Sequence, residues 1–144
     1  MKPERKKRGG KYDSSAALLQ GVCVRPTRQR LALAAWLFDG SDKHVTAEES
    51  SAAMRRRRAG VSLATIYNTL NAFTESGLLR QIAIDGAQIY FDTNTNDHYH
   101  FFDEKTGHLT DIPASSIRFA QLPKIPDGKA LLRVDVVLRV QRAR

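Results

Sequence analysis

The sequence contains little of several residue types that define common classes of protein. Cys23 is the only cysteine in 144 residues, which excludes an intrachain disulfide and a zinc site built from four thiolates. No apolar run approaches the roughly 18 to 20 residues of a membrane span, and no apolar segment follows the basic start of the chain. We therefore expect a cytoplasmic protein in which nitrogen and oxygen atoms hold any metal.

Acidic residues are fewer than basic ones, 15 against 23, and the formal net charge is +8. This imbalance indicates a polyanionic partner. Much of the charge lies in residues 1–12, which carry six lysine or arginine residues and only Glu4 as an acid. We predict that residues 1–12 form a disordered basic tail that follows DNA phosphates. The alternative is a tail that only increases solubility.

Four helices are predicted between residues 14 and 77, where apolar residues recur every three to four positions. Glycine and proline mark the expected ends of these helices at Pro26, Gly40, Gly60 and Gly77. The expected N-caps of the last three are Thr27, Thr46 (with Glu49 in a capping box) and Ser62. The expected buried stripes are Leu31, Ala34, Ala35 and Phe38 on the second helix, and Leu63, Ile66, Leu70 and Phe73 on the fourth.

A β-hairpin follows the fourth helix. Residues 79–84 and 87–91 alternate between apolar and polar side chains, and Asp85-Gly86 between them is a strong two-residue turn signal. Helices followed by such a hairpin predict a winged helix. Its last helix would enter a major groove about 12 Å wide, and the hairpin would lie along the neighbouring backbone.

The polar residues 93–96 mark a boundary between a DNA-binding domain of residues 13–92 and a second domain of residues 93–144. The second domain is predicted to contain strands at 98–102, 108–112 and 131–140 and a brief helix at 114–120. A domain of roughly 50 residues buries too little apolar surface to be stable alone. We therefore expect a homodimer that pairs through the 131–140 strand, and the fold class is α+β.

His98 and His100 are the most informative residues for chemistry. On a strand, residues two apart point to the same face, so the two imidazoles can converge on one ion. Asp92 and Asp97 add oxygen donors nearby, which favours iron or manganese over a thiolate-binding metal. The alternative is a pair of structural or merely exposed histidines.

Several motifs resemble, in order, those of the ferric uptake regulator superfamily of bacterial metal-sensing transcription factors. These motifs are Arg25–Arg30, His44–Glu49, Ser62–Leu70, Glu75–Leu79 and Asp97–His100. The resemblance spans about residues 14–140. The lack of cysteine pairs and the segments Tyr90–Asn94 and Val134–Val140 are most similar to the iron response regulator branch of α-proteobacteria, which couples haem status to iron-dependent transcription.

The resemblance implies a regulatory metal site. Its ligands would be His44, Asp92, His98, His100 and Asp111. Three imidazoles and two carboxylates suit five- or six-coordinate Fe²⁺ or Mn²⁺, and Zn²⁺ can compete by its greater intrinsic affinity. Because the ligands come from both halves of the chain, a bound ion would hold the DNA-binding domain against the dimerisation domain. It would thereby favour the hinge state that binds the ion more tightly.

The sequence departs from the family pattern at several positions, and each departure leads to a prediction. Residues 103–106 occupy the place of the family's first cysteine pair, so we expect no structural zinc held by four cysteines. Cys23 is expected to be a small buried apolar residue. His108 is expected to be an exposed strand histidine, and haem, if it binds, is expected at His98 or His100.

The expected partner is a pseudo-palindromic, A·T-rich duplex, because winged helices on a two-fold dimer address two half-sites. The resemblance and the position of the fourth helix agree on Tyr67 as a DNA-contacting residue, with Ser62, Thr65 and Asn68 near it. Arg28 and Arg80 are candidates for phosphate contact. The basic run Arg55–Arg58 is either a solvated helix end or a further phosphate contact.

Three other functions remain open at this point. A metalloenzyme could use the same histidines and aspartates, but no nucleophile or base motif accompanies them, so we expect a protein that is not an enzyme. A peroxide-sensing repressor of the same superfamily could use iron or manganese at this site. A purely architectural DNA-binding protein would leave the histidine cluster unexplained.

Overall fold

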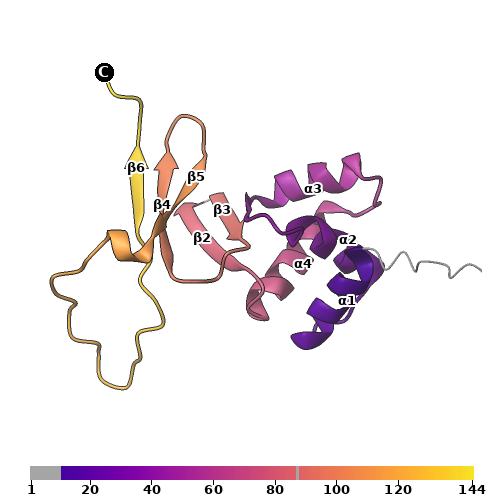
Figure 1. Cartoon of the computed structure of the whole chain (residues 1–144), viewed down its shortest axis with the longest axis horizontal. Coiled ribbons are helices and arrows are strands. Elements are labelled where there is room, and N and C mark those ends of the chain that lie inside the picture. Colours follow the sequence, from indigo (N-terminus) through magenta and orange to yellow (C-terminus); the bar gives the residue numbers. More distant parts are fainter. Residues whose placement is uncertain (1–10, 87) are drawn as a thin grey trace, which may run out of the picture. The chain divides into compact units, whose positions relative to one another are not determined.

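The computed structural model describes residues 11–86 and 88–144. They form two compact units, one that ends at Thr95 and one of Asn96–Arg144 (Figure 1). The division falls within the polar segment 93–96. Residues 1–10, most of the predicted basic tail, lie outside the described residues. Among the described helices, none has the length and apolar character needed to cross a membrane.

The first unit consists of four helices and a small antiparallel sheet whose hairpin follows the last helix, as expected for a winged helix (Figure 1). Its elements are α1 (Lys11–Gly21), α2 (Arg28–Leu37), β1 (His44–Val45), α3 (Ala47–Arg56), α4 (Leu63–Glu75), β2 (Arg80–Asp85) and β3 (Gln88–Asp92). The strand order is β1-β3-β2. The α+β class and the order of helices and hairpin are therefore confirmed.

The three predicted N-caps are confirmed. The side-chain oxygens of Thr27 and Ser62 accept hydrogen bonds from the backbone N–H groups of Arg30 and Thr65. In α3, Thr46 Oγ1 accepts from the N–H of Glu49 at 3.1 Å, and the Glu49 carboxylate accepts from the N–H of Thr46 at 3.0 Å. Each cap satisfies an N–H group that the helix leaves open, a contribution of typically about 1 kcal/mol.

The ends of α1 and α3 differ from the predictions. The N–H groups of Cys23 and Val24 bond back to the carbonyls of Gln20 and Leu19, which places Cys23 in the left-handed region at φ 58°. This turn directs the Cys23 side chain to solvent and buries Val24 instead, so the prediction of a buried cysteine was wrong. Helix α3 ends at Arg56, earlier than the expected end near Gly60.

The core of the first unit is formed by all four helices and by strand residues. Its fully buried members on α2 are Leu33, Ala34 and Leu37, whereas Leu31 and Phe38 are only partly buried. Ile66, Leu70 and Phe73 of α4 are buried as predicted. Leu63 is 44% exposed, because it begins the helix, before the turn that packs on the core. The spacing of apolar residues thus predicted the helices correctly but not every core position.

The sheet contains one strand that the sequence did not predict. β1 has only two residues, and it pairs with β3 so that His44 lies opposite Asp92 and Val45 opposite Phe91. In the hairpin, Asp85 pairs with Gln88 and therefore belongs to β2 rather than to the turn. β1 is too short to show any periodicity, so only its long-range partner defines it.

The second unit is a three-stranded sheet in the order β5-β4-β6, with β5 antiparallel and β6 parallel to the central strand. Its elements are β4 (His98–Asp103), β5 (Leu109–Pro113), the 3₁₀ turn η1 (Ala114–Ser116) and β6 (Val137–Val140). The expected helix at 114–120 is thus a single short turn. The expected strand at 131–140 is present only from Val137.

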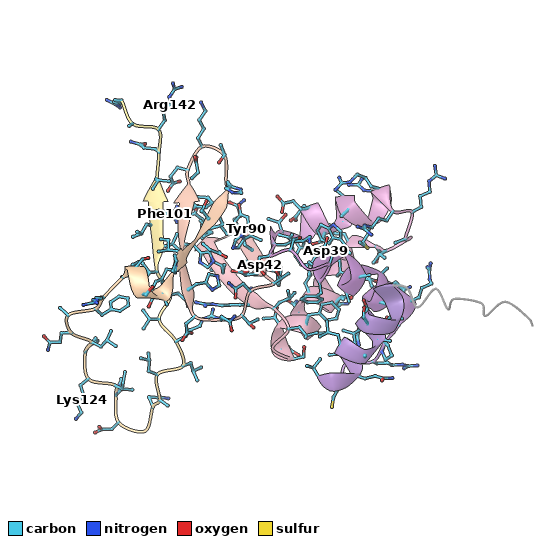
Figure 2. All side chains as sticks on the ribbon, in the orientation of Figure 1. Asp39, Asp42, Tyr90, Phe101, Lys124 and Arg142 are labelled. Carbon is cyan, nitrogen blue, oxygen red and sulfur yellow. The ribbon has the colours of Figure 1, made fainter. Side chains whose placement is uncertain are left out.

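Strand pairing explains the shorter strand, and the local backbone explains the shorter helix. Of the expected strand, residues 137–140 pair with β4 in register, whereas the apolar residue Leu132, outside the sheet, is 95% exposed. After η1 the backbone of Ile117 is extended, and Pro123 and Pro126 then interrupt any regular element. Lys124 lies in this irregular connection (Figure 2).

The two faces of the second sheet differ. On one face, the cross-strand partners Phe102 and Leu109 are buried, and the Arg139 guanidinium lies 5.5 Å from the centre of the Phe102 ring. On the other face, Ile112 is buried opposite Tyr99. Phe101 and Leu138 are paired across β4 and β6, and each is 41% exposed. The second unit therefore carries an exposed apolar pair on its sheet, and Phe101 is labelled in Figure 2.

Candidate functional site

In the first unit, β1 and β3 bring His44 and Asp92 together. The two residues are cross-strand partners, and His44 Nε2 lies 3.3 Å from Asp92 Oδ2. Asp92 is fully buried, and its other oxygen, Oδ1, accepts a hydrogen bond from the N–H of Asn94 at 2.9 Å. Beyond the strands, the Thr93 N–H donates to the Lys43 carbonyl, and the Lys43 N–H donates to the Thr93 hydroxyl oxygen. An imidazole and a carboxylate are thus held side by side at a fixed separation.

In the second unit, His98, His100 and Asp111 form a second group of ligands. His98 and His100 share one face of β4, and His100 is the cross-strand partner of Asp111 on β5. The Nε2 atoms of both histidines lie 3.4 Å from the same atom, Asp111 Oδ1. Both imidazoles are almost completely buried, whereas the Asp111 side chain is 32% exposed.

A hydrogen bond fixes the tautomer of His98. Its Nδ1 atom bonds to the carbonyl oxygen of Asn96, which can only accept, so Nδ1 is the donor and Nε2 is the ring nitrogen that remains to bind a metal ion. Such outer hydrogen bonds orient metal-binding histidines in many proteins. Two ligands bonded to one ion at about 2.1 Å and at right angles lie roughly 3 Å apart. The separations within both groups are close to this value.

Two other residues near these groups do not belong to them. Asp97 is exposed and is not among the residues whose donor atoms converge, although the sequence placed it among the candidate oxygen donors. His108 is exposed, as predicted, but it lies just before β5 and not in a strand. In the turn at residues 103–106, the Asp103 carboxylate accepts hydrogen bonds from the N–H groups of Thr106 and Lys105, which lowers the pKa of Asp103.

Helix α4 exposes the residues expected to contact DNA. Tyr67 is 40% exposed, which excludes the alternative of a core aromatic residue, and Asn68 is also exposed. The Tyr67 hydroxyl donates a hydrogen bond to Glu48 Oε1 at 2.7 Å, and this bond raises the pKa of Tyr67. A cavity of about 370 Å³ at this place is lined by Thr46, Ala47, Glu48, Tyr67, Gln88, Ile89 and Phe91.

The remaining predicted DNA contacts have mixed outcomes. Ser62 and Thr65 lie at the start of α4, where their hydroxyls bond to each other at 2.9 Å and Ser62 also caps the helix. Arg28 is exposed at the start of α2. Arg80 is only 7% exposed, because it lies in β2 opposite Asp92 of β3. A side chain buried in this way does not support the predicted phosphate contact of Arg80.

Sequence reasoning missed Glu48 and Gln88, which line the same cavity as Tyr67. Glu48 follows the first residue of α3, where a carboxylate is favourable for the helix dipole alone. Nothing local to Glu48 indicates that it would meet Tyr67, 19 positions later. Only the packing of α3 against α4 and the hairpin brings these residues together.

The fold and these residues define a winged-helix protein that carries groups of metal-binding imidazoles and carboxylates. The chain belongs to the ferric uptake regulator family, because residues 22–134 match the sequence model of that family. The members of this family are transcription regulators. This match confirms the predicted family. It does not distinguish the iron response regulator branch from other branches of the family.

A curated relative is the peroxide-responsive repressor PerR of Staphylococcus epidermidis, which is 36% identical over 100 residues. These residues are 69% of this chain and 66% of the relative, so the chain spans just under two thirds of that protein's length. Two solved structures share the fold. The ferric uptake regulator of Pseudomonas aeruginosa with manganese has a TM-score of 0.67 at 21% identity and covers 90% of this chain and 98% of its own. That of Vibrio cholerae has a TM-score of 0.69 at 18% identity and covers 88% and 98%.

Proposed function

We propose that the protein is a DNA-binding transcription regulator whose binding to an operator depends on a divalent metal ion. The observation that carries this proposal is the convergence of His98 Nε2 and His100 Nε2 on Asp111 Oδ1, each at 3.4 Å. The two buried imidazoles lie around one carboxylate oxygen, with their rings edge to face at 4.5 Å between centroids. This group has the composition and the spacing of a metal site.

The proposed ligands of the ion are His44, Asp92, His98, His100 and Asp111. Within each unit, the donor atoms are already at distances suited to one ion. Only residues 93–97 separate Asp92 from His98 along the chain. Because the ligands belong to both units, an ion that binds all five would restrain one unit against the other, and only one state of the protein would hold it tightly.

The chemistry of the donors supports Fe²⁺ or Mn²⁺ as the ion. Imidazole nitrogens and carboxylate oxygens, without a thiolate, suit these metals at five or six ligands. Zn²⁺ binds the same donors with greater intrinsic affinity and can substitute for them. The P. aeruginosa regulator of the same fold was solved with manganese.

The proposed DNA contact is made by α4. Tyr67 offers an exposed ring for a thymine methyl group, and Asn68 offers an amide for base edges. The Tyr67 hydroxyl would donate to a phosphate in place of its bond to Glu48. Ser62 and Thr65, at the exposed start of the helix, are proposed as neighbouring contacts, and Arg28 as a phosphate contact. A homodimer would present two such helices to a pseudo-palindromic, A·T-rich operator.

The homodimer is proposed to form through the second unit. Phe101 and Leu138 are apolar side chains on the sheet, and each is 41% exposed. A second copy that covers them would remove this apolar surface from water. No thiolate metal site is available to support the second unit, so this apolar contact is the proposed source of its stability.

Two molecules are candidates for the effector that regulates DNA binding, peroxide and haem. Peroxide is favoured by the name of the relative at 36% identity, a peroxide-responsive repressor. Iron status signalled through haem is favoured by the segments Tyr90–Asn94 and Val134–Val140, which resemble the iron response regulator branch. The burial of His98 and His100 does not fit a porphyrin, which needs an open imidazole, so no step is assigned to haem.

The test is the dependence of operator binding on metal. Operator fragments selected from random duplex by the purified protein with Mn²⁺ provide the ligand, and binding is then measured after chelation and after Mn²⁺ is restored. We expect chelation to weaken operator binding and restored Mn²⁺ to recover it. Operator binding that is equal with and without metal would contradict the proposed function.

A further inference from the structure

A second cavity lies in the first unit, and of its lining residues the proposed function uses only Arg28, as a single phosphate contact. It has a volume of about 460 Å³ and is lined by Arg28, Ala32, Ala35, Arg57, Arg58 and Ala59. The alanines come from α2 and from the segment after α3. Three guanidinium-bearing residues surround this apolar floor, and no acidic residue lines the cavity.

The charges around this cavity are not balanced by the protein. Arg28, Arg57 and Arg58 form no ion pair with any residue in the described part of the chain. Arg28 is the first residue of α2, whose first turn contains no acidic residue. A cation at this end of a helix is disfavoured by the helix dipole. An anion in the cavity would offset both the repulsion among the guanidinium groups and the unfavourable interaction of Arg28 with the helix dipole.

The backbone at Arg58 provides an independent observation. The N–H groups of Arg58 and Ala59 bond to the carbonyls of Arg55 and Met54, and Arg58 is left-handed at φ 53°. Helix α4 ends with the same pattern of bonds, but there the left-handed residue is Gly77. Glycine adopts this conformation without strain, whereas arginine does so at a cost. The arginine adds a side chain that lines the cavity, which glycine could not supply.

We propose that the cavity formed by Arg28, Arg57 and Arg58 binds a phosphate group. Planar guanidinium groups bind phosphate oxygens in pairs, and several of them together can neutralise a dianion. The phosphate can belong to the backbone of bound DNA or to a free phosphorylated small molecule. The first source rests on the proposed DNA-binding function, and the second does not.

The cavity is separate from the proposed base-reading surface. The partner of Tyr67, Glu48, lies in the first turn of α3, whereas Arg57 follows the last residue of that helix. A helix of 10 residues is roughly 15 Å long. A phosphate bound at Arg57 would therefore not occupy the place of the Tyr67 contact.

The test compares Arg58→Gly with Arg56→Gln in the full chain. Both variants remove one positive charge from the end of α3, but Arg56 does not line the cavity. Arg58→Gly also relieves the left-handed backbone, so its thermal unfolding midpoint should be equal to or above that of the wild type. Loss of binding in this variant would then not be a folding defect.

The first measurement is calorimetric titration with inorganic phosphate and with pyrophosphate, without DNA and at constant ionic strength. The second is the salt dependence of binding to a random duplex. A free-ligand site predicts phosphate or pyrophosphate binding that is at least roughly tenfold weaker in Arg58→Gly than in Arg56→Gln. A backbone site predicts no such binding, but a slope of log K against log salt that falls by about one in Arg58→Gly only.

The proposal is overturned if neither measurement separates Arg58→Gly from Arg56→Gln. Operator binding measured in the same preparations keeps this failure distinct from a failure of the proposed function. If the protein recognises its operator with Mn²⁺ but the two variants do not differ, the phosphate-site proposal fails and the proposed function stands.

Discussion

The hydroxyl group of Tyr67 donates a hydrogen bond to Glu48 Oε1 at 2.7 Å, which joins the exposed face of α4 to the first turn of α3. The bond orients the Tyr67 ring and raises the pKa of its hydroxyl, so the group stays protonated. Glu48 would thereby position Tyr67 for the proposed DNA contact.

Replacing Tyr67 with alanine should reduce discrimination between the operator and random DNA by roughly 1–3 kcal/mol, the usual worth of a specific base contact. Binding to random duplex should change little, because phosphate contacts supply most of it. Tyr67→Phe is the control, since it keeps the ring and loses only the bond to Glu48. Competition titrations measure both quantities, and an equal loss on operator and random duplex would argue against a role of Tyr67 in base reading.

The double change His98→Ala and His100→Ala should weaken Mn²⁺ binding by roughly 100-fold or more, since even loss of an outer-shell partner costs roughly 10–100-fold. The fold should persist, because the sheet retains its backbone pairing. Calorimetry with Mn²⁺ measures the affinity, and circular dichroism monitors the fold. His108→Ala serves as a control, because it removes an exposed imidazole outside both ligand groups. Unchanged Mn²⁺ affinity in the double variant would exclude this site.

Leu138→Asp should weaken the homodimer, because it would bury an unpaired charge in the proposed apolar contact. Val136, inside the expected strand, is a poorer choice, since it is half-buried and its carbonyl accepts a bond from the His100 N–H. Leu122→Asp adds the same charge at an exposed position in the irregular connection and should have no effect. Sedimentation gives the mass. The dimer should survive EDTA, and monomers after chelation would contradict an apolar interface.

Peroxide and haem can be separated by the fate of the histidines. If peroxide is the effector, treatment of the Fe²⁺-loaded protein should add one oxygen atom to the peptide that contains His98 and His100, and operator binding should fall. Peptide mass spectrometry detects this product, and the Mn²⁺-loaded protein is the control. Release of DNA by haem, without oxidation of that peptide, would instead favour the iron response reading.

Stability should depend on pH through Asp39, which precedes β1 and His44. Lys43 and Ser41 donate hydrogen bonds to its carboxylate, and these bonds lower the pKa of Asp39. The contribution is therefore complete above the unfolded pKa of about 3.9 and is lost as the pH falls through the lower folded pKa. Asp39→Asn should destabilise the protein at neutral pH and have no effect in strong acid.

Denaturant midpoints measured across this pH range provide the comparison. Asp42→Asn is the matched control, because it removes the same charge from an exposed residue in the same turn; both aspartates are labelled in Figure 2. If Asp39→Asn has the same effect at every pH, the carboxylate is not the source of the stability.

Signals that span a few residues were sufficient for most of the local structure. Thr46 and Glu49 cap α3 through bonds between residues three positions apart, and the hairpin follows from its turn. The alternation of β4 placed His98 and His100 on one face, as predicted. These features depend on neighbours along the chain, so the sequence by itself determined them.

Tertiary structure decided which side chains meet and which are covered. β1 exists because β3 pairs with it, and this pairing places His44 beside Asp92. The strand register buries Arg80, which the sequence assigned to the surface, and a left-handed turn exposes Cys23, which the sequence assigned to the core. Burial and long-range pairing are properties of packed elements, and a pattern along the chain does not contain them.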